Sequence, residues 1–296
     1  MRLSLCLDPG RPWDDVARLA RLADDGGWHA VYVCDHFMPY TDDDRPSSGP
    51  MLECWTTLSA LAGVTDRVRL GPLVLGNTYR HPAVVANMAA TLDQVSHGRV
   101  VLGLGAGWQR NEHDAYGIAL PQPAERASRF DEACTVVRAL LDDEHVTFRG
   151  DHYHLDDAGC EPKPVQTHLP FLVGGTGPRM LEVTARHADV WHSWADVDEL
   201  RERNTRLDAA CERMGRDPRS LSRATGGTVH LTSLGTVPDA EPGDLMGDVE
   251  AVTLALHDLA GAGADEFIVV DDAGSHGLEQ AMDLVSAIDE AVRPLV

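Results

Sequence analysis

Short apolar runs alternate with amphipathic stretches from one end of the chain to the other. Several of these runs are nearly continuous in Val and Leu, which is typical of parallel strands that are covered on both faces. The candidate strands are LSLCL from Leu3, AVYVC from Ala30, VRLGPLVL from Val68, RVVLGLG from Arg99, FLVGG from Phe171, VWHSW from Val190, TVHLTS from Thr228 and EFIVV from Glu266.

Helical periodicity fills the intervals between these runs. In the first interval Val16, Leu19 and Ala23 share one face, and Gly26 ends the pattern. Eight strands that alternate with eight helices predict a closed (β/α)8 TIM barrel or a doubly wound sheet. We favour the barrel and expect one α/β domain over residues 1–296, because no Pro-, Gly- or Ser-rich linker divides the repeat. The predicted helices cover residues 13–25, 55–64, 82–96, 125–141, 178–187, 196–214, 249–261 and 276–292.

Two stretches do not fit the repeat. Residues 145–155, HVTFRGDHYHL, suggest two short strands around Arg149-Gly150-Asp151, a hairpin inserted before strand five. Residues 234–248 are rich in Pro, Gly and Asp and follow strand seven. Loops after barrel strands lie on the catalytic face, so the second stretch is either a lid or an ordinary surface loop.

The chain is strongly acidic, with 47 Asp and Glu against 25 Lys and Arg and a net charge of −22. Such a surface repels nucleic acid and anionic membranes, so a small-molecule substrate is the expected partner. An anionic cofactor would need local positive charge, which helix N-termini and arginines can provide. The six cysteines include no CxxC pair. The apolar stretch before Asp8 is too short for a signal peptide. We therefore expect a cytoplasmic protein.

Reactive groups in a barrel belong at the C-terminal ends of its strands. Strand two ends in Asp35-His36, where the imidazole could exchange a proton with a bound molecule and Asp35 could orient it or cap the next turn. After strand three, Arg80 could reach a phosphate or form a surface ion pair. Strand six brings the aromatic and polar set Trp191-His192-Ser193-Trp194 to the same edge.

Two glycine-rich strand ends are candidates for close approach to a ligand. Gly103–Gly107 has the spacing GxGxG, which differs from the GxGxxG dinucleotide fingerprint. Trp108 follows with a flat face that suits an aromatic cofactor or the core. Gly174-Gly175-Thr176 precedes a helix that begins at Pro178, an arrangement that forms either an anion site or a tight turn.

A metal hydrolase is the competing enzyme class. His152 and His154 have the spacing of a ligand pair, but they lie in the predicted hairpin, and no carboxylate or histidine cluster accompanies them at the strand ends. We therefore expect no metal site. Nucleophilic catalysis is disfavoured too, because no GxSxG elbow is present.

Three segments carry a family resemblance. VCDHFMPY from Val33, the stretch from Gly49 to Ile118, and FLVGGTGPRMLEVTARHADVW from Phe171 resemble the luciferase-like flavin monooxygenase superfamily, and more narrowly its branch of coenzyme F420-dependent oxidoreductases. The resemblance covers most of the chain and is densest from Ala30 to Ile118. The fold of that family is a (β/α)8 barrel, in agreement with the strand count.

The resemblance implies a tricyclic cofactor at the mouth of the barrel: F420, which exchanges hydride with an unidentified small substrate, or FMN, which would make the chain a monooxygenase. A third alternative is a non-catalytic flavin-binding protein. The sugar-phosphate dehydrogenases of this branch carry a glutamate after the strand-four glycines where this chain has Trp108, so the resemblance does not extend to that substrate. The implied catalytic residues are His36 and Asp35, with Tyr40 and Trp191 at the substrate. The implied cofactor-binding residues are Leu73, Val74, Gly105, Ala106, Gly107, Trp108, Gly174, Gly175 and Thr176.

Two further expectations rest on the resemblance alone. A non-proline cis peptide is expected at Leu73–Val74, or failing that at Val74–Leu75, where it would form a bulge behind the cofactor ring. A homodimer is expected through the second and third helices, residues 55–64 and 82–96, which are rich in small and apolar side chains.

Overall fold

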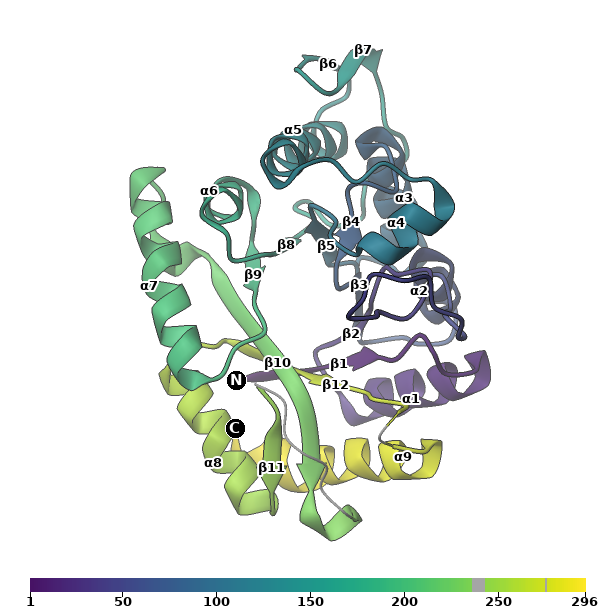
Figure 1. The fold of residues 1–296 in the computed structure, drawn as a ribbon, viewed down its shortest axis with the longest axis vertical. Helices are drawn as coiled ribbons and strands as arrows, with labels where there is room; N and C mark the ends of the chain where they lie inside the picture. The colour runs from purple at the N-terminus through teal and green to yellow at the C-terminus, as the bar shows by residue number, and fades with distance from the viewer. Residues whose placement is uncertain (236–242, 275) are drawn as a thin grey trace.

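The computed structural model describes residues 1–235, 243–274 and 276–296. Its parallel strands form a sheet in the order β3-β2-β1-β12-β10-β9-β8-β5-β4 (Figure 1). A parallel bridge between Leu70 of β3 and Val100, which precedes β5, brings the two sides of this order together. The sheet is therefore a nearly closed barrel, and helices surround it.

The strands are β1 (Arg2–Leu7), β2 (Ala30–Val33), β3 (Arg69–Pro72), β4 (Leu75–Gly76), β5 (Leu102–Gly105), β6 (Val146–Arg149), β7 (His154–Ala158), β8 (Phe171–Gly174), β9 (Val190–His192), β10 (Ser222–Leu231), β11 (Leu245–Gly247) and β12 (Glu266–Val270). The α-helices are α1 (Trp13–Gly26), α2 (Cys54–Ala62), α3 (Pro82–Val95), α4 (Arg110–Tyr116), α5 (Pro123–Asp142), α6 (Pro178–His187), α7 (Val197–Arg213), α8 (Val249–Gly261) and α9 (Leu278–Ala287). Short 3-10 or π segments are η1 (Pro218–Ser220), η2 (Thr232–Leu234), η3 (Ile288–Val292) and η4 (Arg293–Leu295).

The predicted α/β barrel is confirmed, with one change in strand three. The run expected as a single strand is split into β3 and β4, which share one position in the barrel. The peptide bond between Leu73 and Val74, at the split, is cis, as expected. The chain bulges inward at this point, and Val74 comes close to the backbone of β5 and β8.

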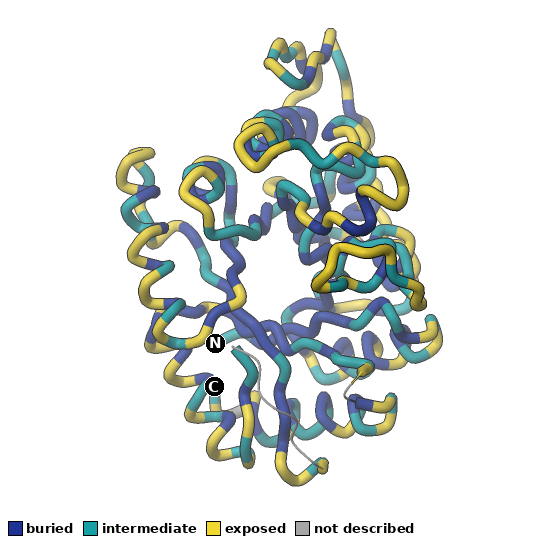
Figure 2. The backbone as a smooth tube through the Cα atoms, in the orientation of Figure 1, coloured by how far each residue is buried: buried dark blue, intermediate teal, exposed yellow. Residues whose placement is uncertain are grey.

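The apolar residues divide between two clusters because side chains alternate along each strand. One cluster fills the inside of the barrel and includes Cys6, Tyr32, Leu172 and Ile268. The larger cluster lies between the strands and the surrounding helices. Figure 2 shows the strands as almost continuously buried and the outer faces of the helices as exposed. The closed inner core leaves the C-terminal ends of the strands as the place where a ligand can enter.

Three segments differ from the sequence-based expectation in their bounds or content. Strand β10 begins at Ser222, well before the expected start at Thr228, and runs through Gly226 and Gly227. Helix α4 was not predicted. The expected lid, residues 234–248, is only partly described: residues 236–242 lie outside the described residues, and β11 pairs in parallel with β10.

At the segment expected to form a hairpin, β6 and β7 pair in antiparallel fashion and project beyond α5 (Figure 1). His152, one of the two histidines considered as metal ligands, has its Nε2 atom 3.1 Å from the Ser128 hydroxyl. Within the described residues, none of the helices combines the length and the apolar character that a membrane span requires.

Candidate active site

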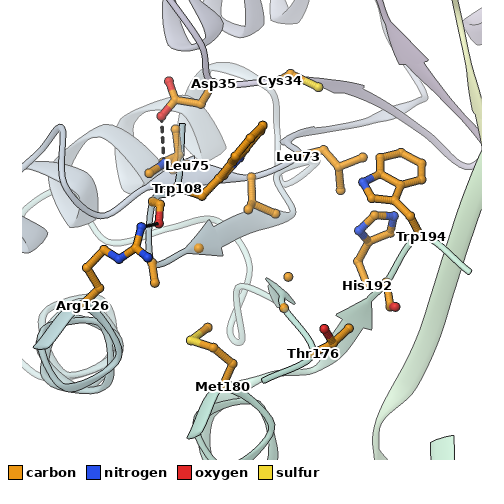
Figure 3. A pocket seen from close by; sticks show the side chains of 18 of the residues that line it. Cys34, Asp35, Leu73, Leu75, Trp108, Arg126, Thr176, Met180, His192 and Trp194 are labelled. Carbon is orange, nitrogen blue, oxygen red and sulfur yellow. Dashed lines mark hydrogen bonds between the residues drawn. The ribbon is translucent and has the colours of Figure 1, made fainter. Parts of the chain in front are cut away.

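The C-terminal ends of the strands surround a cavity of about 650 Å³ (Figure 3). This volume falls in the range of pockets that hold drug-sized organic molecules. Most residues proposed from the sequence line its wall. They are Asp35, His36, Leu73, Val74, Gly105, Ala106, Gly107, Trp108, Gly174, Gly175 and Thr176.

His36 follows β2 and is held by a carboxylate from another element. Its Nδ1 atom lies 2.8 Å from Oε1 of Glu112 in α4. Glu112 is completely buried, and its Oε2 atom accepts a hydrogen bond of 2.7 Å from the backbone N–H of Phe37. The ring of Trp108 packs edge-on against the imidazole, with centroids 5.5 Å apart. The imidazole is thus fixed in orientation and still reaches the cavity.

The hydrogen bonds around Glu112 set the charges of this group. Burial lowers the pKa of His36, but the hydrogen bond and the negative charge of Glu112 outweigh burial, so the net shift is upward. Burial raises the pKa of Glu112, and hydrogen bonds from His36, Phe37 and the Tyr79 hydroxyl reverse this into a net decrease. Burial and Glu112 both raise the pKa of Tyr79, which remains a donor to that carboxylate. Glu112 therefore favours the protonated form of His36.

Asp35 has a different part from the one expected. It is buried and accepts two hydrogen bonds from the Arg80 guanidinium, of 2.7 and 2.9 Å, and one of 2.9 Å from the backbone N–H of Gly76. Arg80 is bound in turn by Glu53 at 2.6 Å. Asp35 thus ties β2 to the end of β4, and Glu112, rather than Asp35, orients His36. These contacts favour a positioning role for Asp35, and its predicted part in catalysis stays a prediction.

The glycines of β5 serve the bulge as well as the cavity. A Cβ atom on Gly103 would lie 1.9 Å from the carbonyl oxygen of Pro72, and one on Gly105 would lie 2.6 Å from a methyl carbon of Val74. A Cβ atom on Gly107 would meet the Thr78 hydroxyl at 2.5 Å. A side chain at Gly103 or Gly105 would displace the bulge. The GxGxG spacing is therefore explained first by packing against neighbouring parts of the chain, which are the Pro72 carbonyl and the side chains of Val74 and Thr78. Access to a ligand is a second consequence.

The opposite part of the wall is suited to an anion. Gly174, Gly175 and Thr176 lead into the N-terminus of α6, where backbone N–H groups and the helix dipole favour negative charge. Arg126 of α5 also lines the cavity, with its guanidinium 2.7 Å from the Gly107 carbonyl oxygen. Among the described residues Arg126 has no acidic partner. The wall thus offers the local positive charge that an anionic cofactor needs in so acidic a chain.

At the end of β9, the structure places Trp191 differently from the sequence-based assignment and brings other residues to the cavity. Trp191, expected at the substrate, is fully buried outside the cavity and donates a hydrogen bond of 2.9 Å to the Gly175 carbonyl. Because successive side chains on a strand point to opposite faces, His192 faces the cavity instead. Trp194 lines the wall beside it (Figure 3). Tyr40 lies outside the lining, with its half-exposed ring 5.4 Å from that of Trp108.

The residues present fit a flat, anionic organic cofactor. Apolar and glycine-rich surface from Val74 and Gly105 forms one side, and the α6 N-terminus and Arg126 can meet a phosphate. Sequence reasoning missed Glu112, Tyr79 and Arg126 as site residues, and it named His192 and Trp194 only as members of the aromatic and polar set at a strand end. The one signal for Glu112 was its place a few residues after the β5 glycines.

Comparison with known proteins shows the family to which the chain belongs. Residues 2–234 match the family model of the luciferase-like monooxygenases. A protein of Nakamurella multipartita named F420-dependent glucose-6-phosphate dehydrogenase is 36% identical over 178 residues, which cover 59% of this chain and 50% of that protein. One of Kineococcus radiotolerans with the same name is 37% identical, covering 59% of this chain and 50% of its own length. The chain thus spans about half the length of these relatives.

Solved structures match over nearly the whole chain. The F420-dependent tetrahydromethanopterin reductase of Methanopyrus kandleri has a TM-score of 0.82 at 19% identity, covering 99% of this chain and 98% of its own. An F420-dependent secondary alcohol dehydrogenase, solved with an F420–acetone adduct, has a TM-score of 0.83 at 21% identity, covering 100% and 99%. A monooxygenase of Streptomyces bottropensis has a TM-score of 0.82 at 22% identity, covering 99% of both. Because the sequence identities are only 19%, 21% and 22%, these matches show that the fold is shared.

Proposed function

Because the chain belongs to the luciferase-like monooxygenase family, we propose that it is an oxidoreductase that uses coenzyme F420 and acts on a small organic molecule. The observation that carries the proposal is the His36–Glu112 pair, a proton carrier at the wall of a cavity large enough for a tricyclic ring. The names of the relatives that match at 36% and 37% identity support F420 over FMN.

The residues that would hold the cofactor follow from the shape of the wall. Leu73 and Val74 would support the ring from behind. Gly174, Gly175 and Thr176, together with Arg126, would bind the phosphate, since they combine backbone N–H groups with a positive charge that lacks an ion pair among the described residues. Gly105, Ala106, Gly107 and Trp108 would flank the tail. When bound, the deazaflavin supplies or accepts a hydride.

His36 would handle the proton that accompanies the hydride. In the direction of oxidation, a substrate alcohol loses its hydroxyl proton to neutral His36 as its carbon loses a hydride. In the direction of reduction, protonated His36 gives that proton to the carbonyl oxygen. Glu112 stabilises the imidazolium in both directions, because its carboxylate is buried and 2.8 Å away. Trp108 would exclude water from the same side of the cavity.

An activity screen tests this proposal. Purified protein is mixed with F420 or its reduced form and a panel of alcohols, aldehydes, ketones and sugar phosphates, and the absorbance band of the oxidised deazaflavin is followed. We expect turnover with at least one substrate class and a loss of about 100- to 10,000-fold in kcat in His36→Ala, while F420 still binds. A His36→Ala variant within a few-fold of the parent enzyme would refute the role of His36.

We also propose that two copies of the chain pair through α2 and α3. The two helices form an apolar groove that includes Trp55, Ala83, Met88 and Val95. Val84 and Val95 are each about half exposed, at 52% and 53%. Apolar surface gathered in one hollow, rather than scattered singly, is typical of a protein interface. A second copy presents the same groove about a twofold axis, so one surface can serve both partners.

A further inference from the structure

A second cavity, of about 340 Å³, adjoins the one at the mouth of the barrel. The two cavities share Tyr79, Ala106 and Arg126 in their walls, and Figure 3 shows Arg126 extending from its helix to the main cavity. The rest of the second wall comes from the segment after β4, from α5 and the loop before it, and from the β6–β7 hairpin. Among the described residues that line it are three arginines and no Asp or Glu, in a chain with 47 acidic residues against 25 Lys and Arg. The second cavity is therefore a local exception to the acidic character of the chain.

The β6–β7 hairpin supplies a hydroxyl group to this wall. Glu132 of α5 accepts hydrogen bonds of 2.8, 2.9 and 3.1 Å from the backbone N–H groups of residues 151–153. These bonds hold the turn of the hairpin against α5 and place Tyr153 in the lining. The Tyr153 hydroxyl accepts a hydrogen bond of 3.2 Å from the Asn77 amide, which leaves its own hydrogen for another acceptor.

Arg126 brings to the shared wall a positive charge that nothing in the described chain balances. Its guanidinium makes one hydrogen bond, to the Gly107 carbonyl at 2.7 Å, and has no acidic partner among the described residues. Burial and the nearby charge of Arg110 lower the pKa of Arg126, so its surroundings disfavour the charged form. The side chain is only partly buried, so a ligand in either cavity can reach it.

Arg129 adds further donors on the same face of α5, because it follows Arg126 by three residues. Its Nε atom donates to Glu125 at 2.8 Å, and its terminal amino groups make no other hydrogen bond within the described residues. The side chain is 38% exposed, so these groups too are within reach of a ligand. Arg80, the third arginine of the lining, already binds two carboxylates.

The groups that remain available in this wall are donors, and two of them are cationic. Guanidinium groups bind carboxylates and phosphates through charge-assisted hydrogen bonds, which are stronger than those between neutral groups. An anion in the second cavity would also offset the repulsion between Arg110 and Arg126. An uncharged ligand would leave that repulsion in place, so the wall selects an anion.

We propose that the second cavity is an anion-binding site, in which Arg126, Arg129 and the Tyr153 hydroxyl bind a carboxylate or a phosphate group. This chemistry has two possible sources. One is an extension of the cofactor in the main cavity, since F420 continues beyond its phosphate into a chain of glutamate carboxylates, whereas FMN ends at the phosphate. The other is a separate small anion. The first source rests on the proposed function, and the second does not.

Titrations of the folded protein test the site and distinguish the two sources. The parent protein, Arg129→Gln and Tyr153→Phe are each titrated with F420 and FMN, followed by fluorescence, and with glutarate, followed by calorimetry. Arg293→Gln is the matched control. Arg293 also forms an i,i+4 ion pair through its Nε atom, with Asp289 at 2.6 Å, its side chain is 39% exposed, and it lies outside both cavities. Thermal unfolding checks that each variant is folded, and Arg129→Gln decides alone if Tyr153→Phe is not.

If the anion belongs to the cofactor, Arg129→Gln should raise the Kd of F420 about 5- to 20-fold and leave that of FMN within twofold. If the anion is separate, the parent should bind glutarate, and Arg129→Gln should weaken that binding by the same factor without changing the Kd of F420. Tyr153→Phe should act on the same ligand by about 2- to 5-fold, and Arg293→Gln on none.

The inference is overturned if Arg129→Gln stays within twofold of the parent for all three probes, or if Arg293→Gln loses as much affinity as Arg129→Gln. It is overturned as well if the parent binds none of the probes. A parent that binds FMN or glutarate but not F420 would refute the proposed function. In that case the glutarate titrations alone decide whether the second cavity binds an anion.

Discussion

Glu112 influences the cavity through the pKa of His36. Glu112 is buried and fully hydrogen-bonded, so it remains ionised and raises the pKa of the imidazole. A raised pKa means that the stabilisation from this pair is complete below the ordinary histidine value of about 6.5 and is lost as the pH rises through the higher folded-state value. The same shift keeps His36 protonated over more of the neutral range.

Replacing Glu112 with glutamine isolates this effect. Glu112→Gln keeps the shape of the side chain and removes its charge, so the pKa of His36 should fall below its value in the parent protein. NMR titration of labelled histidine measures it directly. Asp114→Asn is the control, because Asp114 is an exposed carboxylate on the same helix, and it should leave the value unchanged. If the pKa of His36 in Glu112→Gln equals that in the parent protein, the positioning role of Glu112 is contradicted.

At the scale of elements, the bulge between β3 and β4 depends on the glycines of β5. Gly105→Ala would place a Cβ atom 2.6 Å from a methyl carbon of Val74, whose β-branched side chain has few alternative rotamers. We expect a loss of about 1–3 kcal/mol in the free energy of unfolding, measured with urea. Gly261→Ala is the control: its Cβ would meet nothing within 4 Å, so it should be neutral or stabilising by up to about 1 kcal/mol. Equal stability of Gly105→Ala and the parent would show that the bulge can adapt.

The barrel and much of its mouth could be predicted from the sequence because parallel strands bring their C-terminal ends to one edge. Strand ends alone located His36, Gly105 and Thr176. Glu112 could not be found this way, since it reaches the site from a short helix whose own pattern is weak. The assignment of Trp191 failed because a three-residue strand does not fix its phase, and a slip of one residue exchanges the two faces.

Glycines misled the prediction of β10. The strand was expected to begin at Thr228, directly after Gly226 and Gly227, and glycine usually weakens a strand interior. In the structure they lie within β10 and permit close contacts: a Cβ atom on Gly226 would collide with the Ile268 carbonyl, and one on Gly227 with the Gly243 carbonyl. Such contacts join segments far apart in sequence, so local propensity cannot reveal them.

At the scale of the whole molecule, the proposed dimer predicts the effect of one surface charge. Val84→Glu places a carboxylate in the apolar groove of α2 and α3, where burial against a second copy would strip its water. Light scattering at micromolar concentration should give the mass of a dimer for the parent and of a monomer for the variant. Leu254→Glu is the control, because Leu254 is an exposed apolar residue on α8, away from the groove, and this variant should remain dimeric. A monomeric parent protein would refute the proposal.

The choice of cofactor decides between the two chemistries that this fold supports. Parallel titrations of the parent protein with F420 and FMN, followed by fluorescence under the same conditions, measure it most directly. The proposed function predicts that F420 binds more tightly than FMN. It also predicts that a substrate oxidises reduced F420 without uptake of oxygen. Equal or tighter binding of FMN, together with oxygen consumption driven by reduced FMN, would contradict it.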